Sequence, residues 1–137
     1  MGVSFVTVAG LAAKQNGRVT TRQLRDTYLI PDVFVAGEIR LTYTHHDRVV
    51  LGGAVPAGAD LRLTGYPEIR SESFLEHREL GVVNVGGEGV VTADGVEHTM
   101  VTGACLYLGR GVEDVRFRDG ATAEADLTPN TTAWIGL

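Results

Sequence analysis

Positive charge, cysteine, proline and long apolar runs are all scarce in this sequence of 137 residues. Its 12 basic residues include one lysine, Lys14, and form no cluster, whereas 17 acidic residues give a net charge of −5. Because nucleic-acid-binding proteins present clustered positive charge to phosphates, we expect no nucleic-acid partner. An acidic small molecule needs only two or three well-placed arginines, so a sugar-acid ligand stays open.

The lack of cysteine pairs and of membrane segments predicts the compartment. Cys105 is the one cysteine, so no disulfide can form within the chain, which is typical of the reducing cytosol. The apolar run around Cys105 predicts a small buried group. No apolar stretch approaches the roughly 20 residues that cross a bilayer, and residues 1–10 lack the positive segment of a signal peptide. We therefore expect a cytoplasmic protein with no membrane partner.

Glycine, by contrast, is abundant, and its 18 residues lie between short apolar runs. Ile39, Leu41 and Tyr43 alternate with polar neighbours, as in a half-buried strand. Asp94-Gly95 between two apolar runs predicts a tight hairpin, because both turn positions need positive φ. Many short strands with almost no helix predict an all-β sandwich or barrel.

The two ends of the chain differ from this pattern. Thr20 or Thr21 suits a helix N-cap, Gln23 weakly matches a capping box, and Pro31 ends the short helix. The tail lacks alternation and ends in Trp134-Ile135-Gly136-Leu137, which predicts an edge strand or a segment that docks elsewhere. We predict one domain of residues 1–137, with an N-terminal arm and helix over 1–32, a β-sandwich core over 33–118 and a C-terminal tail over 119–137.

The four histidines, His45, His46, His77 and His98, do not have the spacing of a metal site. His45 and His46 are adjacent, so on a strand they point to opposite faces and cannot hold one ion together. A catalytic divalent site needs three or four converging ligands, and no H-x-H pair is present. The spacing therefore predicts no metal site in this chain.

Two charged segments could instead bind or react. On a strand, Glu76 and Arg78 would share one face while His77 and Glu79 shared the other. Arg78 could then grip a carboxylate, although a salt-bridged strand edge that resists aggregation explains the same residues and is favoured by spacing alone. The segment around His45 and Arg48 has the same two interpretations. The weak catalytic candidates are His45, Arg48, His77, Arg78 and Glu79.

Two motifs resemble those of the cupin superfamily of small jelly-roll barrels: ELGVVNVGGEG over 79–89 with the following Asp94-Gly95, and VTGACLYLGRG over 101–111. The resemblance implies a cupin-like jelly roll with a short N-terminal helix. In metal-binding cupins an H-x-H pair precedes the glutamate and a histidine follows the second motif. Ser73 and Leu75 stand at the first pair of positions and Glu113-Asp114 at the last, so only Glu79 carries over.

A longer match, in order over roughly residues 20–117, is to the N-terminal portion of the 5-keto-4-deoxyuronate isomerases (4-deoxy-L-threo-5-hexosulose-uronate ketol-isomerases). That resemblance implies isomerisation of a ketouronate in pectin and uronate breakdown by two stacked cupin domains. It also implies a zinc ion held by three histidines and a glutamate of the C-terminal domain, and no cofactor in the part seen here. The matching segments are LRDTYL (24–29), VFVA (33–36), YTHHDRVVLGG (43–53), FLEHRELGVVNVGG (74–87) and LYLGRG (106–111).

Three functions follow from the sequence. The first is a structural N-terminal half, inactive alone, whose partners are its own copies, through Trp134 and Ile135, or a C-terminal catalytic cupin domain. The second is a small metal-free isomerase in which His77 or Glu79 is the base and Arg78 polarises the carbonyl. The third is a domain that binds a sugar acid without reacting.

Overall fold

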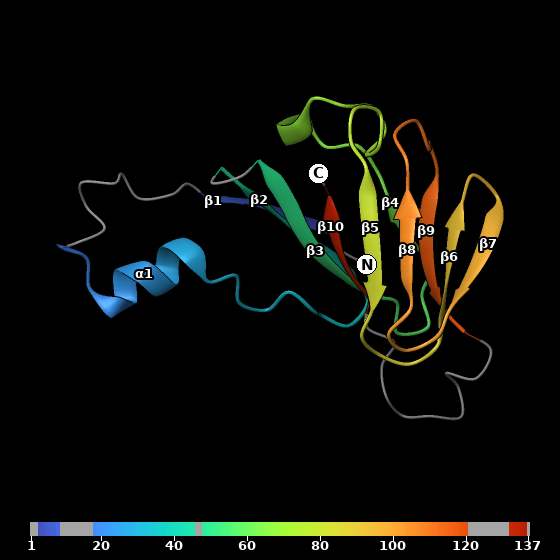
Figure 1. The fold of residues 1–137 in the computed structure, drawn as a ribbon, viewed down its shortest axis with the longest axis horizontal. Coiled ribbons are helices and arrows are strands. Elements are labelled where there is room, and N and C mark those ends of the chain that lie inside the picture. The colour runs from blue at the N-terminus through green and yellow to red at the C-terminus, as the bar shows by residue number, and fades with distance from the viewer. Residues whose placement is uncertain (1–2, 9–17, 46–47, 121–131, 137) are drawn as a thin grey trace.

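The computed structural model describes residues 3–8, 18–45, 48–120 and 132–136, with the backbone alone in the first and last of these ranges (Figure 1). These residues form one α-helix, one short 3-10 helix and ten strands arranged in two sheets. The elements are β1 (Val3–Val8), α1 (Thr21–Tyr28), β2 (Glu38–Thr44), β3 (Val49–Val55), β4 (Leu61–Leu63), η2 (Pro67–Ile69), β5 (Leu80–Asn84), β6 (Gly89–Ala93), β7 (Val96–Met100), β8 (Cys105–Leu108), β9 (Val115–Asp119) and β10 (Thr132–Gly136).

The strand order is that of a jelly roll. One sheet runs β1-β2-β3-β10-β5-β8 and the other β4-β9-β6-β7. If the eight strands from β3 to β10 are renumbered 1 to 8, the first sheet contains them in the order 1-8-3-6 and the second sheet in the order 2-7-4-5. All neighbours within this set pair antiparallel. Two interlocked Greek keys give this order, so the all-β jelly-roll prediction is confirmed.

Local sequence explains the individual elements. The alternation in β2 buries Ile39 and Leu41 and leaves their neighbours partly exposed, as predicted. Asp94 and Gly95 have φ of 46° and 82°, so the predicted turn joins β6 to β7. Thr20 caps α1, and its side chain accepts from the Gln23 backbone N–H in a capping box, also as predicted.

Inward-facing side chains of both sheets pack into one core. Phe74 and Leu75, from the loop before β5, are 1% and 0% exposed and close one end of it. Burying such a side chain stabilises the fold by about 1.5–3 kcal/mol. The strand residues of the core are Ile39, Leu41, Val50, Ala54, Leu61, Leu63, Leu80, Val82, Val91, Ala93, Met100, Leu108, Val115 and Phe117.

The arm between α1 and β2 crosses the first sheet at a glycine. A Cβ placed on Gly53 would overlap the Val33 carbonyl oxygen and the Phe34 ring, so this position in β3 must lack a side chain. The helix itself has no buried residue and projects away from the sandwich (Figure 1). None of the helices in the described ranges is long and apolar enough to cross a bilayer.

Several sequence-based expectations are corrected by the structure. β10 does not lie at an edge, because it pairs with both β3 and β5. Residues 76–79 belong to the loop before β5, with bends at 76 and 77, rather than to a strand, so the expected alternation of faces does not apply. Cys105 is exposed rather than buried, because the inward positions of β8 belong to Leu106 and Leu108.

Asn84 links the two sheets from a fully buried position at the end of β5. Its Nδ2 donates to the carbonyl oxygens of Gly87 at 2.8 Å and Met100 at 2.7 Å. Its Oδ1 accepts from the Gly86 N–H at 3.1 Å. Every polar atom of this amide is therefore partnered, which a buried polar side chain requires.

We expect Asn84→Ala to lower the free energy of unfolding by about 2–4 kcal/mol, because it leaves buried carbonyl oxygens without donors. Asn84→Asp should cost more at pH 7, since a carboxylate would face those same oxygens. Urea denaturation measures both changes, with the exposed Thr99→Ala in β7 as the control. Equal stability of Asn84→Ala and Thr99→Ala would contradict this role.

Candidate functional site

The five candidate residues lie at one end of the six-stranded sheet but in two separate places. Arg48 directly precedes β3 and Glu79 directly precedes β5. Gly136 of β10 pairs with Val50 on one side and with Leu80 on the other, which brings both strand starts to the same end. With β10 between them, the backbones of β3 and β5 lie about 10 Å apart.

His45 and Arg48 belong to the turn between β2 and β3, and both are exposed. The His45 ring packs edge-on against the Tyr43 ring, with centroids 4.8 Å apart. Arg48 adopts a left-handed φ of 56°, which the turn imposes on it. His45 and Arg48 are therefore both in contact with solvent, and the imidazole of His45 is an acid–base group at the surface rather than in a pocket. Their neighbours His46 and Asp47 lie outside the described residues.

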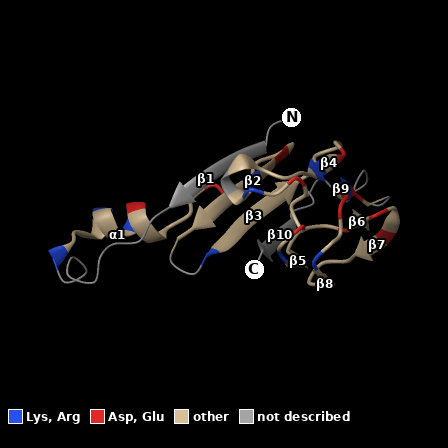
Figure 2. Ribbon diagram, turned by 90° about the horizontal axis from the view of Figure 1, so that it is seen from above, with Lys and Arg blue, Asp and Glu red and all other residues tan. Residues whose placement is uncertain are grey.

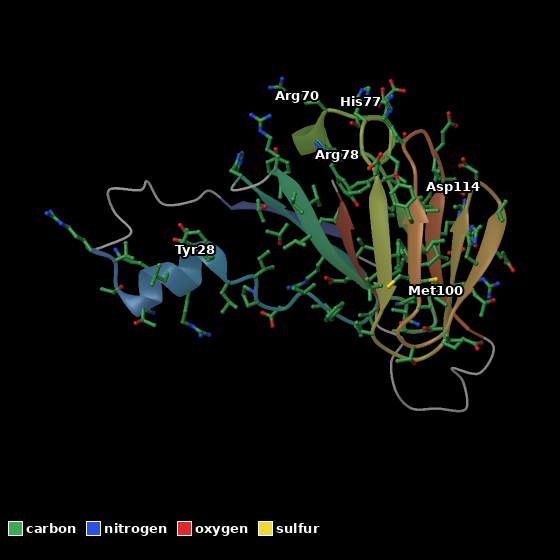
Figure 3. All side chains as sticks on the ribbon, viewed as in Figure 1. Tyr28, Arg70, His77, Arg78, Met100 and Asp114 are labelled. Atoms are coloured by element: carbon green, nitrogen blue, oxygen red, sulfur yellow. The ribbon has the colours of Figure 1, made fainter. Side chains whose placement is uncertain are left out.

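The residues before β5 diverge from one another. The His77 side chain is 67% exposed, and its Nε2 lies 3.4 Å from Glu76 Oε1. Arg78 is partly buried, and its Nε is shielded from solvent without a hydrogen-bond partner. In Figure 3, His77 lies at the outer tip of the loop and Arg78 nearer the body of the protein. A base and an electrophile that act on one carbonyl would have to converge, and this geometry does not bring His77 and Arg78 together.

Glu79 contacts a residue that the sequence analysis did not select. The carboxylate lies beside the phenol of Tyr107 on β8, where their hydrogen bond, slight desolvation and the negative charge all raise the pKa of Tyr107. The register of β5 with β8 explains the contact, because Gly81 stands directly opposite Tyr107. Glu79 comes two residues before Gly81 and so lies on the same side of the sheet as Tyr107. Only the pairing of β5 with β8 reveals it, so spacing along the chain gave no signal.

An open hollow of about 500 Å³ lies at the end of the sandwich where Phe74 and Leu75 close the core. Its wall contains three carboxylates and one arginine, and Arg62 is already bound to Asp114 through Nε–Oδ1 at 2.7 Å. The remaining charge is negative, so the hollow favours a cation or a neutral polar ligand over a free sugar acid. Its lining is Arg62, Leu63, Thr64, Glu72, Ser73, Glu76 and Glu113.

The positions that hold metal in cupins do not form a donor set here. Leu75 is an aliphatic core residue, Ser73 lines the hollow, and Glu79 faces Tyr107. Asp114 is held between two guanidinium groups. Within the described ranges, no group of three or more histidine, cysteine, aspartate or glutamate side chains is placed to hold a metal ion. Zinc does not fit the donors at these positions.

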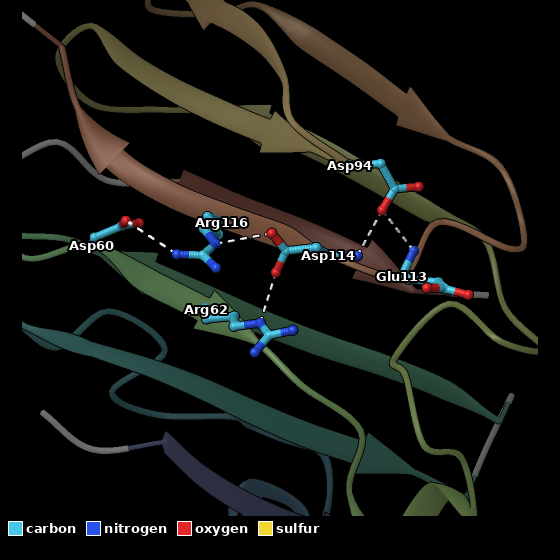
Figure 4. A network of polar contacts seen from close by, with 6 residues as sticks. All are labelled: Asp60, Arg62, Asp94, Glu113, Asp114 and Arg116. Atoms are coloured by element: carbon cyan, nitrogen blue, oxygen red, sulfur yellow. Dashed lines mark hydrogen bonds and ion pairs between the residues drawn. The ribbon is translucent and has the colours of Figure 1, made fainter.

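The densest polar cluster covers the outer face of the four-stranded sheet (Figure 4). Asp114 accepts from Arg62 Nε at 2.7 Å and from Arg116 Nε at 2.9 Å. Asp94 Oδ1 accepts from the backbone N–H groups of Glu113 and Asp114 at 3.0 and 2.8 Å. The cluster therefore ties the β6–β7 turn to the segment entering β9. Because its charges are mutually paired, it is a structural network rather than a reactive one.

Comparison with curated proteins shows which proteins the chain is similar to in sequence. The chain is 53% identical over 103 residues to the 4-deoxy-L-threo-5-hexosulose-uronate ketol-isomerase of Kineococcus radiotolerans, which covers 75% of this chain and 37% of that protein. It is 46% identical over 112 residues to the protein of the same name from Bacillus pumilus, covering 82% and 41%. The chain is a relative of these ketol-isomerases. It spans about two fifths of the length of the curated relatives it matches, and the predicted resemblance is confirmed.

No family model matches the chain. Among solved structures, it is similar to the Cupin_2 domain of an XRE-family transcriptional regulator from Enterobacter cloacae, with a TM-score of 0.44, 16% identity and coverage of 64% of this chain and 77% of that one. It is also similar to a cupin-superfamily sugar phosphate isomerase from Silicibacter pomeroyi, with a TM-score of 0.39, 21% identity and coverage of 64% and 48%.

The ion pairs of Asp114 give a pH-dependent prediction. Partial burial acts to raise the pKa of Asp114, but Arg116 and Arg62 outweigh it and hold that pKa below its ordinary value. A carboxyl whose pKa is lowered by folding stabilises the protein above its unfolded pKa, and this contribution disappears as pH falls through the folded pKa. We expect Asp114→Asn to cost up to about 1 kcal/mol at pH 7 and progressively less below about pH 4.

Urea denaturation at pH 7 and pH 3 checks this sign. Asp60→Asn is the matched control, because Asp60 lies 3.7 Å from Arg116 and 54% of its side chain is exposed. The control should change stability less at pH 7. A cost of Asp114→Asn that grows in acid would contradict the assignment.

Proposed function

We propose that this chain is the jelly-roll domain of a ketol-isomerase that acts on a ketouronate, and that its role is structural. The observation that carries the proposal is the 53% identity over 103 residues to a protein of that name. The matched segment covers 37% of that relative, so most of the relative's length lies outside the match. We assign the reacting groups and the zinc site to that remaining part.

The arrangement of side chains supports a structural role. Exchange of a proton between neighbouring carbons needs a base at the α-carbon and a group that polarises the carbonyl. His77 is largely solvated, Arg78 lies apart from it, and Glu79 is engaged with Tyr107. A ketouronate entering the hollow would also meet three carboxylates and an arginine that Asp114 already binds.

One observation favours a second function, a metal-free domain that binds or isomerises a sugar acid. Arg78 Nε is buried and has no partner. A buried donor without an acceptor costs about 1–3 kcal/mol, and the carboxylate of a sugar acid could accept from it. In this alternative Arg78 would hold the ligand and Glu79 or His77 would supply the base.

Turnover by the purified chain separates the two functions. We expect no conversion of 4-deoxy-5-ketouronate above the buffer control, with the full-length relative from Kineococcus radiotolerans as the positive control. Conversion that rises in proportion to the concentration of this chain, and that Arg78→Ala with Glu79→Ala abolishes, would contradict the structural role and establish the second function.

Ligand binding without turnover needs its own measurement. A saturating ligand raises the unfolding temperature, so a uronate at millimolar concentration should leave that temperature unchanged if the domain is structural. A rise that Arg78→Ala removes and the exposed control Arg110→Ala retains would favour the binding domain instead.

A further inference from the structure

A pocket lies where the arm between α1 and β2 meets the outer face of the six-stranded sheet. Its volume is about 330 Å³, which is within the range of small-molecule sites. Asp26 and residues 29–33 form one wall, and residues 40–42 with Leu51 form the other. We call this space the arm pocket.

Contacts on either side of the arm pocket hold its two walls together. Arg40 Nη1 donates to the Asp32 carbonyl oxygen at 3.4 Å. Further along the arm, the Phe34 ring lies against Gly53, and the Gly37 N–H donates to the Val55 carbonyl oxygen at 2.7 Å. The wall formed by the arm is therefore tied to β2 and β3 by backbone contacts and by the missing side chain at Gly53.

Much of the lining is apolar. Leu29, Pro31 and Val33 come from the arm, and Leu51 comes from β3. Leu29 is 44% exposed, so apolar surface of this wall remains in contact with water. A ligand with a hydrocarbon stem would remove that surface from water, which favours binding in proportion to the area covered.

The charged groups of the arm pocket leave it negative. Asp26 lies in the turn of α1 nearer to the sheets, where Figure 2 shows an acidic segment, and Asp32 follows on the arm. Within the described residues, neither carboxylate has a hydrogen bond or an ion pair. Arg40 also lines the pocket, but its Nε already lies 3.2 Å from Glu38 Oε2. Two carboxylates therefore remain without a counter-charge.

The end of α1 adds to this negative potential. The last carbonyl oxygens of a helix form its negative pole. The Leu29 N–H satisfies the Arg25 carbonyl at 2.9 Å. Pro31 has no N–H, so it cannot donate to the carbonyl oxygen of Thr27, four residues earlier. The helix thus directs unsatisfied oxygens to the region where Asp26 begins the pocket wall.

We propose that the arm pocket binds a small aliphatic ammonium ion. An ammonium group has three donors and no acceptor, so it matches the carboxylates of Asp26 and Asp32. Its hydrocarbon stem would cover Leu29 and Leu51. A free carboxylate would instead be repelled by the two aspartates. The site is therefore unsuited to a ketouronate, and its ligand goes beyond the proposed function.

The arm pocket is separate from the sites considered above. The hollow near Phe74 shares none of its lining residues with it, and the segment from His77 to Glu79 is also absent from its lining. The self-association predicted through Trp134 and Ile135 stays a prediction, because those two side chains lie outside the described residues.

A ligand series on the native chain tests the chemistry of the pocket. Hexylamine, which is cationic at pH 7, should shift the amide NMR signals of residues 26–33, 40–42 and Leu51 in the isotope-labelled full chain. Hexanol keeps the stem without the charge and should bind at least about tenfold more weakly. Hexanoate should not bind, since its charge has the wrong sign.

Substitution of both aspartates tests the residues. Asp26→Asn combined with Asp32→Asn should weaken hexylamine binding at least about tenfold. Asparagine suits position 32, because it tolerates the left-handed φ of 53° found there. The matched control is Asp60→Asn combined with Glu97→Gln, which removes the same charge from side chains that are 54% and 61% exposed and lie outside the pocket. The control should bind hexylamine within about twofold of the native chain.

Four results would overturn the proposal. The first is the absence of amide shifts with hexylamine up to about 10 mM, where binding is weaker than an affinity of about −3 kcal/mol would give. The second is equal binding of hexylamine by the Asp26→Asn, Asp32→Asn protein and its control. The third is binding of hexanol or hexanoate as tight as that of hexylamine. The fourth is tighter binding of Nα-acetyl-lysine amide, which would assign the pocket to a lysine side chain of a partner protein.

These measurements do not depend on catalysis. If the Asp26→Asn, Asp32→Asn protein does not fold, as circular dichroism would reveal, the ligand series on the native chain still decides. Because no readout uses isomerase turnover, a failure of this proposal leaves the proposed function unchanged, and a failure of the proposed function leaves the arm pocket unchanged.

Discussion

The fold depends on one constraint: each sheet has a single apolar face, and the two must bury these faces against each other. Val82 of β5 and Phe117 of β9 are 0% and 1% exposed and come from opposite sheets. Asn84 then fixes how the sheets meet, because its amide bonds Met100 of the second sheet while its backbone continues β5 of the first. The arm then packs on the first sheet at Gly53, and the Asp114 network lies on the second sheet.

The outer surfaces of the two sheets differ in charge. On the four-stranded sheet, Arg62, Arg116 and Asp114 neutralise one another and keep that face in water. On the six-stranded sheet, the uncharged Val83 and Tyr107 face outward beside an open edge. In the structural role proposed above, a domain whose described side chains do not assemble a reaction centre would contribute a stable scaffold rather than reacting groups.

Local sequence signals predicted much of this structure, but they did not predict the features that depend on which strands pair. The alternation around Ile39, the Asp94-Gly95 turn and the Thr20 capping box act over a few residues, so the sequence alone identified them. The central place of β10 depends on Val50 and Leu80, which are far from it in sequence. For the same reason the contact of Glu79 with Tyr107 and the outward direction of Cys105 were not foreseen, because both depend on the register of β5 with β8.

The central claim is that this jelly roll supports an isomerase without containing its metal centre. The most direct test is the zinc content per chain, by elemental analysis of the 137-residue protein purified without added metal or a histidine tag. The account predicts far less than one zinc per chain. A value near one, lost when Glu79 or His77 is replaced by alanine, would show that these side chains do form a metal site and would contradict the account.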